Sequence, residues 1–196
     1  MAGLIALREP IVNILFQRGK FDYAATVGTA QALLFYSIGI WSIVGVRVVT
    51  ACFYSMQNTK TPVKVALVAL TSNILFSIIL MQPLKHSGLA LANALASGIN
   101  FSILFFFLRK RLKRVDGRRI VSSFSKSVVA ASLMGLAGWM LLHGELWKTH
   151  GNTVDKAFYL GGTVSGCAIL YLLVSYLLKS EELSYVMNIF KQKFGK

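Results

Sequence analysis

Long runs of apolar residues, separated by short polar segments, dominate this 196-residue chain. A helix needs about 20 apolar residues to cross a hydrocarbon core about 30 Å thick. Five runs reach that length, and each is bounded by charged residues, proline, glycine or asparagine. They cover residues 31–53, 63–81, 88–108, 124–142 and 157–178. The pattern predicts an all-α polytopic transmembrane helix bundle with about five spanning helices, preceded by an N-terminal partial helix.

The apolar runs lack the alternation of a membrane β-barrel, whose strands are segments of about ten residues that alternate apolar and polar side chains. Residues 103–108 read ILFFFL, and residues 168–178 read AILYLLVSYLL. Charged residues make up 14% of the chain, whereas a soluble domain has about 25%. A water-soluble globular protein is therefore excluded.

Basic residues outnumber acidic ones by 21 to 7, and they gather between the apolar runs. Residues 109–126 alone hold eight basic residues and one acid, Asp116. Lys and Arg concentrate in cytoplasmic loops, so this segment is predicted to be cytoplasmic, with the C-terminus on the same side. The resulting organisation has five parts: 1–30, the end of a preceding helix and an outer-face loop; 31–108, three transmembrane helices; 109–126, a basic cytoplasmic loop; 127–178, two terminal transmembrane helices; and 179–196, a basic cytoplasmic tail.

The basic segment 109–126 has two interpretations. It binds anionic lipid headgroups or a cytoplasmic partner, or it serves only as the anchor that sets the topology. Apart from Phe124 it has no interleaved aromatic residues on which bases could stack, so nucleic acid is not an expected partner.

Arg47 is the one charged residue deep inside an expected span, about six residues or about 9 Å from the end of that span. Such residues face a bundle interior or a water-filled cavity, or they extend toward the membrane surface. At about 100° per residue, one stripe of the helix carries the arginine together with two phenols and a hydroxyl. The stripe consists of Tyr36, Ile40, Ile43, Arg47, Thr50 and Tyr54. We expect Tyr36, Arg47 and Thr50 to line a substrate cavity.

Amides and hydroxyls form similar stripes on the next two spans. Asn93, Ser97 and Asn100 recur at helical spacing, and so do Asn73 and Ser77. These groups either contact substrate or hold neighbouring helices together through hydrogen bonds, and both explanations can apply at once. Asn73, Asn93, Ser97 and Asn100 complete the set of cavity candidates.

The last two spans contain small residues instead. Gly162 and Gly166 form a small-xxx-small pair that suits close approach of two helix backbones. All seven acids lie in loops or at span ends, so the chain offers no paired carboxylates, metal cluster or phosphate-binding loop. The sequence therefore predicts neither an enzyme nor a cofactor or metal site.

Three segments resemble the MurJ/MviN lipid II flippase family. They are REPIVNILFQRGKF at 8–21, FYSMQNTKTPVKVAL at 53–67 and PLKHSGLALANALASGIN at 83–100. The resemblance implies a fold of fourteen helices in two inverted six-helix lobes plus two terminal helices, of which this chain is similar to the end of the ninth helix and the tenth to fourteenth. Arg47, within Val46-Arg47-Val48, stands where the family commonly has a basic residue.

The function that the resemblance implies is export of lipid II, the undecaprenyl-pyrophosphate-linked peptidoglycan precursor, across the bacterial cytoplasmic membrane by alternating access. The implied partners are this lipid-linked precursor, membrane lipids and the missing N-terminal half of the transporter. Two alternatives remain open: a fragment of a related exporter of polyprenyl-linked saccharides or drugs, or a membrane-embedded interaction module without transport activity of its own.

Overall fold

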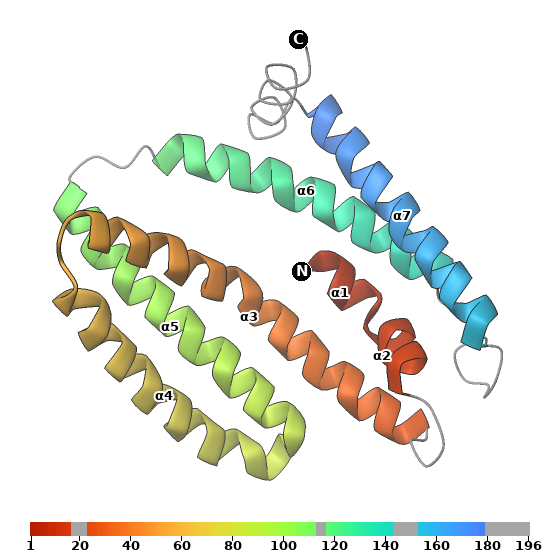
Figure 1. Cartoon of the computed structure of the whole chain (residues 1–196), viewed down its shortest axis with the longest axis horizontal. Coiled ribbons are helices and arrows are strands. Elements are labelled where there is room, and N and C mark those ends of the chain that lie inside the picture. Colours follow the sequence, from red (N-terminus) through yellow and green to blue (C-terminus); the bar gives the residue numbers. More distant parts are fainter. Residues whose placement is uncertain (17–22, 113–116, 143–152, 179–196) are drawn as a thin grey trace. The chain divides into compact units, whose positions relative to one another are not determined.

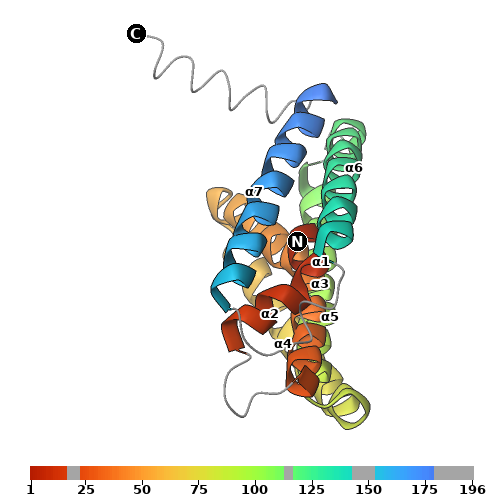
Figure 2. The ribbon, with the colours of Figure 1, turned by 90° about the vertical axis from the view of Figure 1, so that its right-hand side faces the viewer.

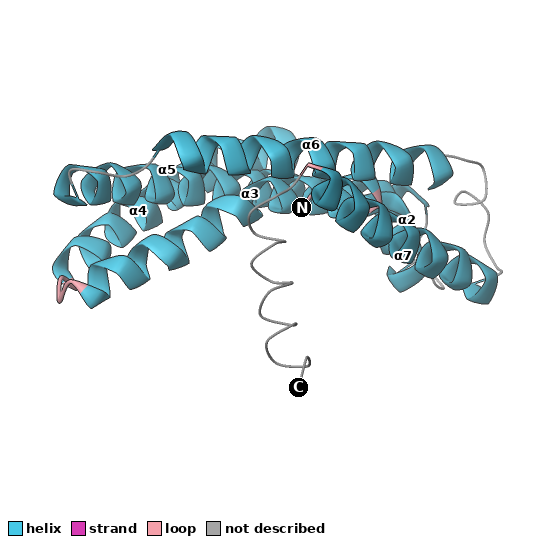
Figure 3. Ribbon diagram, turned by 90° about the horizontal axis from the view of Figure 1, so that it is seen from above, coloured by secondary structure: helices cyan, strands magenta, loops and turns pink. Residues whose placement is uncertain are grey.

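A computed structural model describes residues 1–16, 23–112, 117–142 and 153–178. Within these ranges the regular structure is helical throughout, as Figures 1 and 3 show, which confirms the predicted all-α class. The helices are α1 (Ala2–Ala6), α2 (Arg8–Phe16), α3 (Tyr23–Ser55), α4 (Lys60–Leu84), α5 (His86–Leu112), α6 (Gly117–Leu142) and α7 (Thr153–Leu177).

Five helices are long and apolar enough to cross a membrane, as predicted. They are α3, α4, α5, the part of α6 from Ser122 to Leu142, and the part of α7 from Val154 to Leu177. The chain is thus a multi-pass membrane protein.

The helices are longer than the apolar runs that predicted them. Helix α3 begins at Tyr23, within the segment expected to form an outer loop, and α5 continues to Leu112. Helix α6 begins at Gly117, so helical residues occupy much of the segment 109–126. Backbone hydrogen bonding can continue past the point where the sequence becomes polar, whereas an apolar run reports only the part suited to hydrocarbon. Where the membrane boundary falls within 109–126 stays a prediction.

The described helices divide into two compact units, residues 3–115 and residues 116–196, which we treat separately. In the first unit α5 lies between α3 and α4 and packs along both, whereas α3 and α4 contact each other only sparsely (Figure 1). The three helices thus form one layer in the order α4, α5, α3. The short α2 packs against α3.

Small residues bring α3 and α5 close together. A Cβ added to Gly39 would lie 2.9 Å from the Cα of Ala94, and one added to Gly45 would overlap the ring of Phe101. The same ring meets Trp41 edge-on, with 5.2 Å between the ring centroids. The contacts advance along both helices in the same direction, so α3 and α5 are parallel. Close backbone approach of this kind is the usual basis of helix association in membranes.

A compact apolar cluster closes the end of the layer where α3 and α5 terminate. It contains Val49 and Phe53 of α3, Val65 of α4, and Leu104 and Leu108 of α5. This end is the place where all three helices converge.

The turn from α3 to α4 has the hydrogen bonds of a Schellman motif. The Gln57 N–H donates to the Tyr54 carbonyl at 2.9 Å, and the Asn58 N–H donates to the Phe53 carbonyl at 3.0 Å. Gln57 has a φ of 56°, the left-handed conformation that ends many helices. These bonds satisfy carbonyls that the last turn of α3 would otherwise leave without a donor.

The second unit pairs α6 with α7 (Figures 1 and 2). The Tyr159 hydroxyl donates to the Leu141 carbonyl at 2.9 Å, and the Cys167 thiol lies 3.8 Å from the Met134 carbonyl. A Cβ added to Gly162 or to any other described glycine of α7 would meet no atom within 4 Å. The predicted small-xxx-small pair therefore does not form the contact with α6.

Candidate functional site

The arginine stripe of α3 lies away from the face that packs on α5. Ser42, Val49 and Phe53 are buried, whereas Tyr36 and Arg47 are exposed. Thr50 has an intermediate exposure. The packing of the described helices therefore leaves Tyr36 and Arg47 of the predicted stripe accessible to a ligand, a partner or lipid.

No carboxylate among the described residues pairs with Arg47. An unpaired guanidinium within an apolar span carries a free-energy cost of several kcal/mol unless water, an anion or another polar group meets it. Arg47 is thus the strongest electrostatic feature in the three-helix layer, and its chemistry suits a negatively charged group such as a phosphate.

The amides on α4 and α5 are partly covered. Asn73, Asn93, Ser97 and Asn100 all have intermediate exposure. The side-chain oxygens of Asn73 and Asn100 are buried, and neither has a hydrogen-bond donor. A buried amide oxygen without a donor costs about 1–3 kcal/mol. These two oxygens are therefore buried acceptors for which the described chain supplies no donor.

Several hydroxyls in the spans, by contrast, donate to a carbonyl of their own helix. Ser37 donates to the carbonyl of Leu33 at 2.7 Å, and Thr71 donates to that of Leu67 at 3.0 Å. Serine and threonine reach the carbonyl four residues back, which the longer, planar amide of asparagine does not do as readily. Asn73 and Asn100 differ from these hydroxyls because each buries an oxygen for which the described chain supplies no donor.

Helical geometry turns the stripes to the same side of the layer. On α3, Arg47 lies five residues beyond Ser42 of the α5-facing surface, a rotation of about 140°. On α5, Asn93 precedes the α3-facing Ala94 by one residue, a rotation of about 100° in the opposite sense. Because α3 and α5 are parallel and face each other, these opposite rotations point both stripes to one side.

Helix α4 contributes to that same side. Its α5-facing surface includes the buried Val65 and Ala69, and Asn73 lies four residues further on. Since α4 is antiparallel to α5, the rotation from Ala69 to Asn73 carries the amide toward the side of the layer that bears Arg47. Helical geometry thus turns Arg47, Asn93 and Asn73 toward the same side of the layer. No hydrogen bond between the seven predicted residues is found in the described chain, and their role as a cavity wall stays a prediction.

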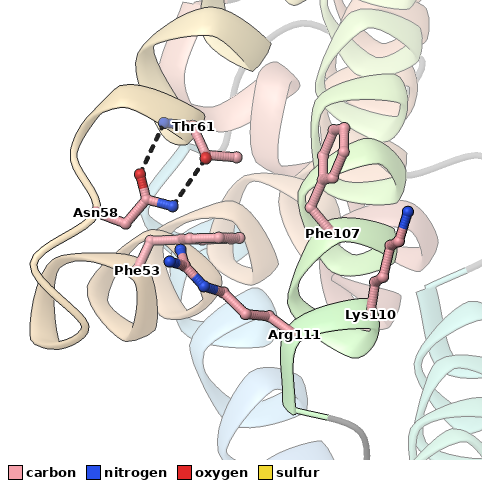
Figure 4. Close-up of a pocket in the computed structure, with 6 residues that line it drawn as sticks. All are labelled: Phe53, Asn58, Thr61, Phe107, Lys110 and Arg111. Carbon is pink, nitrogen blue, oxygen red and sulfur yellow. Dashed lines mark hydrogen bonds between the residues drawn. The ribbon is translucent and has the colours of Figure 1, made fainter.

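The structure also reveals a pocket that the sequence analysis did not single out. It has a volume of about 270 Å³ and lies at the convergent end of the layer (Figure 4). Its lining residues are Phe53, Asn58, Thr61, Phe107, Lys110 and Arg111. The Asn58-x-x-Thr61 spacing at the start of α4 is the part of this pocket that is visible in the sequence. The sequence alone does not show that this turn lies next to the end of α5.

Comparison with known proteins identifies the relatives of the chain. Residues 1–187 match the family model described as "Lipid II flippase MurJ". A protein of Rickettsia prowazekii named "Probable lipid II flippase MurJ" is 29% identical over 178 residues, which are 90% of this chain and 35% of that protein.

Two further relatives have the same name. The protein of Buchnera aphidicola subsp. Schizaphis graminum is 30% identical over 97% of this chain and 37% of its own length. The protein of Vibrio cholerae is 30% identical over 91% of this chain and 34% of its own length. The chain therefore spans roughly a third of the length of these relatives.

Proposed function

This chain belongs to the lipid II flippase MurJ family, and from that premise we propose that it is the C-terminal part of a flippase that exports lipid II. In this proposal the transporter moves the undecaprenyl-pyrophosphate-linked precursor across the bacterial cytoplasmic membrane by alternating access. No covalent bond is made or broken. The match to the family over residues 1–187 is the observation that carries the proposal.

The polar face of the α4–α5–α3 layer is the proposed wall of the substrate cavity. Lipid II offers phosphate oxygens, sugar hydroxyls and peptide N–H groups. Arg47 suits the phosphate oxygens, and the amides of Asn73 and Asn100 would accept from hydroxyl or amide donors by turning outward from their buried positions. Tyr36, Thr50, Asn93 and Ser97 add groups that both donate and accept on the same side.

The charge distribution supports an orientation with residues 109–126 and the C-terminus in the cytoplasm. The helices that complete an inverted-repeat fold would come from the N-terminal part of the transporter, which is thus a proposed partner. Within this arrangement the open side of α3, including Arg47, would face that part rather than lipid.

A complementation experiment tests the proposal. This chain is co-expressed with the N-terminal part of a MurJ relative in cells depleted of their own flippase, and a fusion of the two parts serves as the parallel arm. We expect growth to be restored by both arms and lipid II to reach the outer leaflet. Failure of both arms, with both proteins present in the membrane, would contradict the proposal and favour a related exporter or an interaction module.

Arg47 provides the test of the site. Arg47→Leu in the complementing pair should lower lipid II export by about tenfold or more, because it removes one charged hydrogen-bonding group from the cavity wall. Arg47→Lys should retain a larger fraction of activity. The matched control is Val48→Ala, which alters the neighbouring exposed residue on another face of α3. Equal export by Arg47→Leu and Val48→Ala would remove Arg47 from the site.

A further inference from the structure

The pocket at the convergent end of the layer combines apolar and cationic walls (Figure 4). Phe53 and Phe107 are its aromatic lining residues, and Lys110 and Arg111 are its basic ones. The guanidinium group of Arg111 points toward the turn that carries Asn58 (Figure 4). Two cations next to two phenyl rings suit an amphiphile with an anionic head.

Neither cation of the pocket is neutralised by the described part of the chain. No described carboxylate pairs with Lys110 or Arg111. Both lie in the last turn of α5, where positive charge also complements the helix dipole. That dipole effect would apply equally to Arg109 of the same turn, which does not line the pocket. The dipole alone therefore does not explain why two cations and two rings surround one cavity.

The polar edge of the pocket is preorganised as a donor. The Asn58 amide nitrogen donates to the Thr61 hydroxyl oxygen at 2.9 Å, and the Asn58 amide oxygen accepts from the Thr61 backbone N–H at 3.2 Å (Figure 4). Because the Thr61 oxygen already accepts, its own proton is oriented away from Asn58. No described acceptor takes that proton, so the hydroxyl can donate to a ligand in the pocket.

The position of the pocket matches a lipid headgroup. It lies where α3 and α5, two candidate spans, end, and the next residues of the chain are strongly basic. A headgroup phosphate lies at this depth of a bilayer, and clusters of Lys and Arg beside a span attract anionic lipids. The exposed ring of Phe107 would then contact the glycerol and upper acyl carbons of the same molecule, with the buried Phe53 beneath.

We propose that this pocket binds the phosphate group of an anionic phospholipid. Arg111 neutralises the phosphate, Lys110 adds a second positive charge when its flexible chain turns toward it, and the Thr61 hydroxyl donates to it. The exposed ring of Phe107 holds the apolar part of the molecule. The site is separate from the Arg47 face and does not depend on the proposed transport of lipid II.

Lipid retention tests the site directly. The whole chain is purified in a neutral detergent and titrated with phosphatidylglycerol, and bound lipid is counted by native mass spectrometry. Phosphatidylcholine and inorganic phosphate are titrated in parallel arms. We expect one saturable phosphatidylglycerol molecule, weaker binding of phosphatidylcholine, and no competition by inorganic phosphate at millimolar concentration.

Variants then locate the bound lipid. The double variant Lys110→Gln/Arg111→Gln should weaken phosphatidylglycerol binding by about tenfold or more, because it removes both charge-assisted contacts. Thr61→Val should weaken it by a smaller factor. The control Arg109→Gln removes one positive charge from the same helix turn, half of what the double variant removes, and should change binding less than about twofold.

Three results would overturn the proposal: an equal loss in Arg109→Gln and the double variant, an absence of saturable binding, or full competition by inorganic phosphate. The first would indicate general electrostatic attraction, and the last would indicate a free-phosphate site. Circular dichroism of each variant checks that its helices are retained, and Thr61→Val provides an uncharged test if the double variant loses helix. Lipid counting requires no transport, so its failure is distinct from failure of complementation.

Discussion

The three-helix layer and the α6–α7 pair use glycine in opposite ways. In the layer, Gly39 and Gly45 lie against a neighbouring helix, and an added Cβ would contact Ala94 or Phe101. In the pair, the described glycines of α7 lie in open space, and Gly162 is one of them. Glycine therefore marks a helix contact inside the first unit. In α7 it marks a surface that the described chain does not cover.

Polar groups differ between the units in a similar way. The layer buries two amide oxygens without a donor, at Asn73 and Asn100. The α6–α7 pair is joined instead by side-chain bonds to backbone carbonyls, from Tyr159 to Leu141 and from Cys167 to Met134. The layer thus packs closely but leaves the two buried amide oxygens without donors. In the α6–α7 pair, Tyr159 and Cys167 each contact a backbone carbonyl of the other helix.

The largest expected effect comes from a methyl group at a glycine contact. Gly39→Ala should lower the free energy of unfolding by about 2 kcal/mol, because the new Cβ would lie 2.9 Å from the backbone of Ala94. Unfolding of the chain by SDS in mixed micelles measures the change. Gly162→Ala is the matched control and should change stability by less than about 0.5 kcal/mol. Similar losses of stability in both variants would show that the glycines of the two units do not differ in their packing.

A smaller effect of opposite sign is expected at the buried amide of α5. Asn100→Leu should raise the free energy of unfolding by about 1 kcal/mol, since it removes a buried oxygen that lacks a donor. Asn93→Leu serves as control, because Asn93 has no such buried oxygen among the groups without donors. The same mixed-micelle titration applies. A loss of stability in Asn100→Leu would mean that the amide is already satisfied, and the layer would then resemble the α6–α7 pair.

The smallest effect concerns the bond between α6 and α7. Tyr159→Phe should lower stability by about 0.6 kcal/mol, the typical value for a side-chain hydrogen bond between membrane helices. Tyr176→Phe removes an exposed hydroxyl of the same helix and should leave the transition unchanged. Helix proximity in each variant can be followed by disulfide trapping between cysteines placed in α6 and α7. Equal trapping and stability in both variants would show that the bond contributes nothing to the pairing.

The helices could be predicted because a membrane-crossing helix needs a long run of residues with few charges, and the sequence shows both. The residues of the polar stripes were also predictable, since their spacing follows the helix period. The orientation of the stripes relative to each other was not, because it depends on which residues of α3 and α5 touch. Gly39 and Ala94 settle that relation, and they are separated by 55 positions in the sequence.

The pocket and the open glycines were beyond sequence reasoning for the same reason. Asn58 and Arg111 come together only because α5 folds back between α3 and α4. Gly162 and Gly166 have the spacing of a helix contact, yet the partner surface is not α6. Local spacing identifies which residues share a face, whereas tertiary contacts decide what that face meets.

The interlocked contacts of α5 limit how the layer can deform. The Ala94 backbone and the Phe101 ring fit against α3 only because Gly39 and Gly45 have no side chain. Sliding α3 along α5 by part of a turn would drive Ala94 and Phe101 against the larger residues that flank those glycines. Packed interfaces of this kind switch between discrete arrangements rather than shear continuously. Any large movement of these helices is therefore expected as rotation of the α4–α5–α3 layer as a single rigid body, with its hinges outside the layer.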